Sequence, residues 1–204
     1  MKLEFQMEDD EADAEKAVNA YNTLKDNGMK VFIGTVTTGA CLSVISQTKA
    51  DNMFQITPSA SAAKVIANDN CFQVCFTDPN QGTASADYIA SKGLAKKVGV
   101  IYNSSDAYSS GVYDNFKAEA AAKGLDLVAS EAFTGDSKQD FSSQLSKIKA
   151  SGAELIIPSD FIIRKLLLFF LRLKLRVLLL SSSAATVLTD FLTSRTLISL
   201  LQKT

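Results

Sequence analysis

Segments typical of β-strands alternate with segments typical of amphipathic helices through the first 160 residues of the chain. Short runs rich in Val, Ile and Phe lead into loops, and apolar residues at helical spacing follow, as in Ala17, Ala20, Tyr21 and Leu24. Parallel strands that follow one another in a chain need a crossover connection, which is usually a helix. The alternation therefore predicts an α/β fold in which parallel sheets are flanked by helices.

The expected elements follow directly from this alternation. We expect strands near residues 2–6, 31–35, 53–57, 72–76, 98–102, 125–133 and 154–158, and helices at 12–27, 39–49, 61–66, 79–92, 107–123 and 139–150. A chain of 204 residues can bury the core of one or two domains of this kind.

The composition argues against catalysis. Histidine, the commonest general base and metal ligand, is absent from the sequence. Cys41, Cys71 and Cys75 form no CxxC pair, so we interpret them as buried thiols and expect neither a metal nor a cofactor. GxSxG, Walker and Rossmann motifs are also missing. We therefore expect a protein that is not an enzyme, and its acidic core without a basic stripe indicates no nucleic-acid partner.

Two consecutive strand-to-loop junctions, at residues 31–39 and 53–61, carry the candidate binding residues. Each runs from an apolar stretch into a loop of Ser, Thr, Gly and Ala, followed by residues that can begin a helix. Backbone N–H groups at a helix N-terminus favour a carboxylate or a phosphate. An ordinary βα turn is the alternative for either loop alone. Because the carboxyl ends of parallel strands share one sheet edge, the pair predicts a small-molecule site.

Three further motifs follow in a fixed order: DPNQG at residues 78–82, VGVIYNSSDAYSSG at 98–111 and GDSKQDFSSQL at 135–145. In order and spacing they resemble the periplasmic leucine/isoleucine/valine-binding proteins, which are the type I solute receptors of ABC transporters. The resemblance covers about residues 1–160. It implies an incomplete two-lobed type I periplasmic-binding-protein fold that closes on an amino acid.

The resemblance also implies roles for particular residues. In the family, two loops hold the ligand α-carboxylate through backbone N–H groups and a hydroxyl, and the matching residues here are Thr38, Gly39, Ala40, Ser59, Ala60 and Ser61. The hydroxyl would be that of Ser61, and a tyrosine matching Tyr108 lies across the cleft. Asp78 and Asp106 are hinge or cleft candidates. A helix N-cap is the alternative for each aspartate, and packing on a helix face is the alternative for Tyr108.

The resemblance further implies a domain organisation and a function for the full-length protein. Residues 1–77 would form part of the first lobe, without its first strand and helix, and residues 78–160 part of the second lobe. The full-length protein would be an extracytoplasmic subunit that binds a branched-chain or aliphatic amino acid and delivers it to ABC permease subunits. We expect it in the periplasm or outside the cell, associated with the membrane, although no export signal is visible at residues 1–5.

A second function remains open at this point, namely the ligand-sensing domain of a signalling receptor with the same fold. Neighbouring permease and ATPase genes would favour transport. A kinase or channel domain in the same full-length chain would favour sensing.

The composition changes near residue 160. Residues 1–160 contain fourteen Lys, no Arg, eight Leu and twenty-one acidic residues, which gives a formal charge of −7. Residues 161–204 contain four Arg, three Lys, fourteen Leu and one acidic residue, which gives +6. No glycine follows Gly152, although tight αβ turns commonly use it.

Three interpretations of residues 161–204 compete. A transmembrane helix is interrupted by Arg164, Lys165 and Arg172 among other charges, and a basic surface helix lacks a defined apolar stripe. The third interpretation is an aberrant, out-of-frame tail, which we favour. Synonymous codons for residues 161–180 can be chosen so that another frame reads YNTEASLILSQAKAAGITT, an amphipathic helix ending near glycine. The acid that binds the ligand ammonium in the family would then be lost with the following loop.

Overall fold

The computed structural model describes residues 2–137, 140–159 and 176–177. Contacts between Cα atoms divide the chain into two compact units. Unit 1 contains Met1–Asn80 and Asp106–Gly111, and unit 2 contains Gln81–Ser105 and the chain from Val112 onward. The domain boundaries predicted from the sequence, 1–77 and 78–160, stay predictions.

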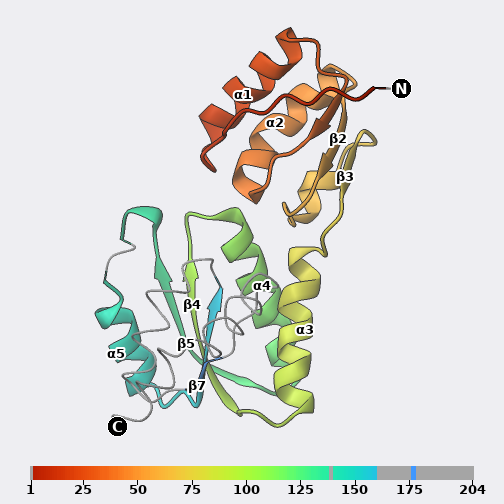
Figure 1. Ribbon diagram of the computed structural model, residues 1–204. Coiled ribbons are helices and arrows are strands. Elements are labelled where there is room, and N and C mark those ends of the chain that lie inside the picture. Colours follow the sequence, from red (N-terminus) through yellow and green to blue (C-terminus); the bar gives the residue numbers. More distant parts are fainter. Residues whose placement is uncertain (1, 138–139, 160–175, 178–204) are drawn as a thin grey trace, which may run out of the picture. The chain divides into compact units, whose positions relative to one another are not determined.

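Unit 1 contains a three-stranded parallel sheet with the order β1-β2-β3. The strands are β1 (Val31–Ile33), β2 (Phe54–Thr57) and β3 (Cys71–Gln73), and the helices are α1 (Ala14–Asp26), α2 (Thr38–Ala50) and the 3₁₀-helix η1 (Ala63–Ile66). Each helix leads into the next strand, so the crossover connections predicted from the alternation are present (Figure 1).

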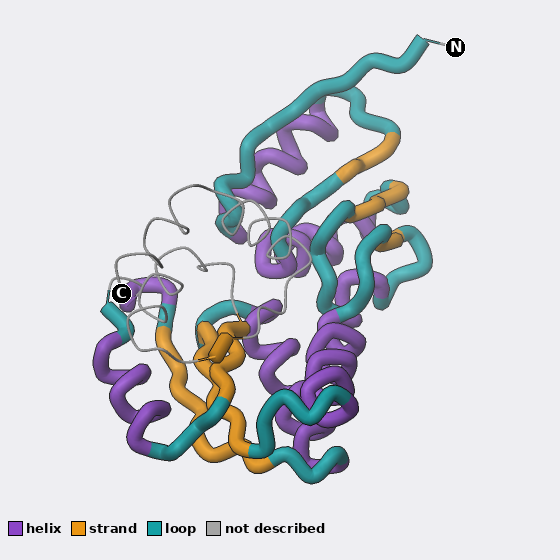
Figure 2. Tube along the Cα trace, turned by 60° about the horizontal axis from the view of Figure 1, so that its bottom comes forward, coloured by secondary structure: helices purple, strands orange, loops and turns teal. Residues whose placement is uncertain are grey.

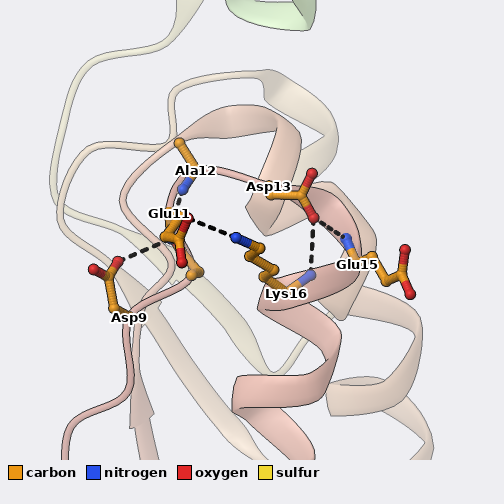
Figure 3. A network of polar contacts seen from close by, with 7 residues as sticks. Asp9, Glu11, Ala12, Asp13, Glu15 and Lys16 are labelled. Atoms are coloured by element: carbon orange, nitrogen blue, oxygen red, sulfur yellow. Dashed lines mark hydrogen bonds and ion pairs between the residues drawn. The ribbon is translucent and has the colours of Figure 1, made fainter.

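Helix α1 begins in a short acidic segment whose carboxylates bond to nearby backbone (Figure 3). Asp13 is the extended N-cap residue, and its Oδ1 accepts the N–H groups of Glu15 and Lys16, both at 2.9 Å. Upstream, Asp9 Oδ1 accepts the N–H of Glu11 at 2.8 Å. Aspartate favours such local bonds at helix N-termini. These hydrogen bonds explain why acidic residues precede the first turn of α1.

One face of the unit 1 sheet packs against α1 and α2. Tyr21 is fully buried and meets Phe32 edge-on, with ring centroids 5.3 Å apart. The Tyr21 hydroxyl donates to Asp51 Oδ2 at 2.8 Å, and Lys25 Nζ donates to Asp51 Oδ1 at 2.5 Å. This contact joins α1 to the end of α2. The apolar core of this face consists of Ala17, Tyr21, Leu24, Phe32, Ala40 and Val44.

The opposite face of the same sheet is apolar and exposed. Val31 and Ile33 are 53% and 65% exposed, whereas Phe32 between them is 6% exposed, as expected when successive side chains point to opposite faces. Phe54 and Phe72 stack on this outer face with centroids 5.2 Å apart. Parallel sheets are usually covered on both faces. In the described part of the chain, these side chains leave an apolar sheet face open.

The strand predicted near residues 2–6 is wrong. Residues 2–10 form neither helix nor strand, and Leu3, Phe5 and Met7 are exposed. Alternating apolar residues form a strand only when their backbone finds a ladder partner, and the sheet of unit 1 is built from β1, β2 and β3. Residues 2–6 therefore have the alternating side chains of a strand but do not pair with the described sheet of unit 1.

Unit 2 contains a parallel sheet with the order β5-β4-β6-β7. The strands are β4 (Lys97–Asn103), β5 (Asp126–Phe133), β6 (Leu155–Ser159) and β7 (Arg176–Val177), and the helices are α3 (Asp78–Ser91), α4 (Ala107–Ala122), the 3₁₀-helix η2 (Gly135–Ser137) and α5 (Ser142–Ala150). Helices α3 and α4 lie on one face of this sheet and α5 lies on the other (Figure 2). Their buried side chains form a separate apolar cluster on each face.

The fold class predicted from the sequence is confirmed. Every predicted strand and helix other than the strand near residues 2–6 is present, with bounds within three residues, although 61–66 contains a 3₁₀-helix rather than an α-helix. No helix within the described ranges is long and apolar enough to cross a membrane. The interpretations of residues 161–204 lie outside the described residues, apart from the short strand β7.

Candidate functional site

The first turn of α2 presents backbone amides without a side-chain cap. Thr37 is the extended N-cap residue, with φ −89° and ψ 148°, and its side chain makes no capping bond. The first helical bond runs from Cys41 N to Thr37 O at 3.0 Å. The N–H groups of Thr38, Gly39 and Ala40 therefore have no acceptor among the described residues.

The hydroxyl of Thr37 adds a further donor beside these amides. Thr37 Oγ1 is buried and has no hydrogen-bond partner among the residues that the structure describes. Buried polar groups are nearly always paired, so an orphan at this place needs an explanation. Sequence reasoning missed Thr37, although a threonine directly before the first helical residue is a detectable signal.

The loop at residues 59–61 has its backbone satisfied from within unit 1. Thr57 Oγ1 accepts the N–H groups of Ser59 at 3.4 Å and Ala60 at 3.0 Å, and Thr38 Oγ1 accepts the N–H of Ser61 at 3.1 Å. The structure thus brings the two predicted loops together through the Thr38–Ser61 bond. The amides of Thr38, Gly39 and Ala40, rather than those of 59–61, are the ones left to donate.

Thr57 shapes this loop and was also missed by sequence reasoning. Its fully buried hydroxyl donates to Thr35 O at 2.5 Å while accepting the loop amides. A threonine whose hydroxyl accepts N–H groups two and three residues ahead is a recognised turn motif. That local signal was available in the order Thr-Pro-Ser-Ala at 57–60.

Ser61 and Asp78 form a buried reciprocal pair. Ser61 Oγ donates to Asp78 Oδ1 at 2.5 Å, and Asp78 N donates to Ser61 O at 2.9 Å. The two residues are 3% and 2% exposed. Burial raises the pKa of Asp78, the hydrogen bond from Ser61 lowers it, and the negative charge of Asp106 raises it further. Asp78 thus joins the beginning of α3 to the loop at 59–61.

Asp106 and Tyr108 lie at the beginning of α4. Asp106 Oδ2 accepts the N–H of Ser109 at 2.8 Å, which is the bond of a helix N-cap. Tyr108 is in the first helical turn and is 7% exposed. The roles of both residues toward a ligand stay predictions.

The cysteines are free thiols. Cys41 and Cys71 are buried, whereas Cys75 is half-buried. Burial raises the pKa of Cys41 to about 11, so this thiol stays protonated near neutral pH. Across the described ranges, no group of three or more His, Cys, Asp or Glu residues is arranged to hold a metal ion.

Comparison with known proteins assigns this architecture to a family. The family model described as "Periplasmic binding protein" matches residues 1–161, and the chain therefore belongs to the periplasmic binding protein family. The family is one of solute-binding proteins rather than enzymes. The match ends where the composition changes.

Individual relatives agree with this assignment. Leu/Ile/Val-binding protein homolog 3 of Brucella melitensis is 32% identical over 157 residues, which cover 76% of this chain and 42% of the relative. A leucine-binding protein from Thermotoga maritima has a TM-score of 0.69 at 26% identity, covering 74% of this chain and 43% of that structure. A branched-chain amino acid transporter substrate-binding protein from Streptococcus pneumoniae, solved with isoleucine, shares the fold with a TM-score of 0.67 at 24% identity, covering 74% and 43%. The chain thus spans less than half the length of these proteins.

Proposed function

We propose that this chain is the ligand-binding part of a solute receptor that serves an ABC transporter, and that its ligand is an amino acid with an aliphatic side chain. The observation that carries this proposal is the group of unengaged donors at the beginning of α2, namely the amides of Thr38, Gly39 and Ala40 and the hydroxyl of Thr37. The names of the relatives as Leu/Ile/Val-binding and leucine-binding proteins support the choice of ligand.

The chemistry of this group of donors suits a carboxylate. Hydrogen bonds to a charged group contribute roughly 1.5–3 kcal/mol each, and the partial positive charge of a helix N-terminus adds about 0.3–1 kcal/mol. The loop at 59–61 is already shaped by bonds to Thr57 and Thr38, so little ordering would remain to oppose binding. We infer that the ligand α-carboxylate binds at the first turn of α2, next to Ser61.

The same proposal places the complete receptor in the periplasm or outside the cell, where it would pass its ligand to permease subunits in the membrane. It also treats residues 161–204 as an out-of-frame tail. By the complete receptor we therefore mean the full-length protein with its reading frame restored after codon 160.

Thr37→Val tests the site without disturbing the fold. Valine has nearly the same shape as threonine but cannot donate, and the Thr37 hydroxyl has no partner to lose among the described residues. We expect the free energy of unfolding to stay the same or to rise by up to about 1 kcal/mol, because a buried unsatisfied group is removed. Binding of L-leucine to the complete receptor should weaken by roughly 1.5–3 kcal/mol, through one lost bond to a carboxylate.

Calorimetric titration and chemical denaturation measure the two quantities. Thr57→Val is the matched control, because the Thr57 hydroxyl is fully engaged. This control should lower stability by about 1–3 kcal/mol. Unchanged leucine affinity in Thr37→Val would remove Thr37 from the site.

A further inference from the structure

The hydroxyl of Ser61 has one proton, and the structure gives that proton to Asp78. Ser61 Oγ lies 2.5 Å from Asp78 Oδ1, and an ionised carboxylate can only accept hydrogen bonds. A serine hydroxyl that donates to Asp78 has only lone pairs left for any other partner. In this state Ser61 cannot donate to a ligand.

A carboxylate ligand cannot use Ser61 in that state. Ligand oxygens that approach Ser61 Oγ would be repelled by the lone pairs of the serine oxygen. The negative charge of Asp78, whose Oδ1 lies 2.5 Å from Ser61 Oγ, would repel them further. A proton on Asp78 removes both obstacles, because a protonated carboxyl can donate to Ser61 Oγ and leave the serine proton for the ligand.

We propose that Asp78 is a positioning residue that takes up one proton when a carboxylate binds next to Ser61. The proton comes from the solvent and is held on Asp78 Oδ1, the Oδ1–H group then donates to Ser61 Oγ, and the serine O–H turns to the ligand oxygen. The O–H bond formed on Asp78 replaces a bond to hydrogen that breaks in a hydronium ion or a buffer acid, and no other covalent bond changes. The inference rests on the proposed function, because it assumes a carboxylate at Ser61.

The surroundings of Asp78 favour such a proton. Asp78 is 2% exposed. A Cβ placed on Gly111 would lie 2.9 Å from Asp78 Oδ2, so Gly111 of α4 lies against the second carboxylate oxygen. Two other titratable groups interact electrostatically with the Asp78 carboxylate. Asp106, directly before α4, raises the pKa of Asp78 by its charge, and Cys75 has a pKa that is raised by burial and by the charge of Asp78.

The sign of the pH dependence follows from this arrangement. Burial already raises the pKa of Asp78 in the free protein, and a bound anion would raise it further. Between these two pKa values, binding takes up a proton, and the affinity falls as the pH rises, by up to about tenfold per pH unit. A site without this coupling would bind a zwitterionic amino acid with nearly constant affinity over the same range.

The test is calorimetric titration of L-leucine into the complete receptor between about pH 6 and pH 8, where the leucine carboxylate stays ionised. Repeating the titration in buffers of different ionisation enthalpy gives the number of protons taken up. We expect proton uptake by the wild type and an affinity that falls with pH. Asp69→Asn, which removes an exposed carboxylate of unit 1, is the matched control and should behave like the wild type.

Asp78→Asn separates proton coupling from a merely structural role. The asparagine amide can donate to Ser61 Oγ as a protonated aspartate would. We therefore expect no proton uptake, an affinity that is independent of pH, and binding at pH 8 at least as tight as in the wild type. Weaker binding by Asp78→Asn at every pH, together with a wild type that takes up no proton, would overturn the inference.

A second measurement does not depend on a variant or on its folding. Carbon NMR of the Asp78 carboxyl group in the wild type should show an ionised group in the free receptor at pH 8 and a protonated group when leucine saturates the site. A carboxyl signal that stays ionised with leucine bound would also overturn the inference. A wild type that binds no leucine would instead contradict the proposed function itself.

Discussion

Replacing Gly82 by alanine is expected to destabilise the chain by about 2 kcal/mol or more, as overpacking of a rigid contact does. Gly82 lies in α3, where an added Cβ would lie 2.6 Å from Val112 O and 2.7 Å from Phe116 N of α4. These are backbone atoms, which cannot rotate away as the end of a side chain can. The two helices must therefore separate, and the core beneath them, which includes the fully buried Ile89 and Phe116, must loosen.

Urea unfolding followed by circular dichroism measures this effect. Gly39→Ala is the matched control, because Gly39 is also helical but has nothing within 4 Å of an added Cβ. Alanine is the better helix former, so the control should hold stability constant or raise it by roughly 0.5–1 kcal/mol. Equal stability of the Gly82→Ala variant and the wild type would show that α3 and α4 do not approach as closely as the structure indicates.

The second large effect concerns residues 161–204. We expect the chain as printed to bind leucine at least about 2–5 kcal/mol more weakly than the complete receptor with its frame restored, because removing one partner of a buried charge pair costs that much. The partner lost here is the acid that would bind the ligand ammonium. Calorimetry on the two proteins under identical conditions measures the difference.

The coding DNA supplies the control for this prediction. One inserted or deleted base near codon 160 should restore a frame that encodes an amphipathic helix ending near glycine. Micromolar binding by the printed chain, or an intact frame that cannot be recoded in this way, would contradict the interpretation of the tail.

The main elements of the fold could be predicted because their signals are local. Apolar spacing placed α1, and glycines with positive φ, Gly28, Gly93 and Gly124, marked where α1, α3 and α4 end. The predicted strand near residues 2–6 failed for the opposite reason, since a strand depends on a partner that its own sequence does not specify.

The candidate site could be predicted only in outline. The two loops were found because each follows an apolar strand, and the structure joins them through Thr38 and Ser61. The Ser61–Asp78 bond links residues seventeen positions apart, and no local pattern specifies such a pair. The amides at 59–61 looked available because the local turn signal of Thr57 was missed. The third amide donates to Thr38, and no local pattern specifies a bond between residues twenty-three positions apart.

The most direct test is an amide NMR titration of the nitrogen-labelled complete receptor with L-leucine. If the beginning of α2 holds the ligand carboxylate, the amide protons of Thr38, Gly39 and Ala40 should move downfield as the site fills, because each gains a charged acceptor that it lacks in the free protein. Amides that already have a backbone acceptor within unit 2, such as that of Asp126, which donates to Lys96 O at 2.8 Å, should stay unchanged. Saturable leucine binding that leaves these three signals in place would contradict the proposed site.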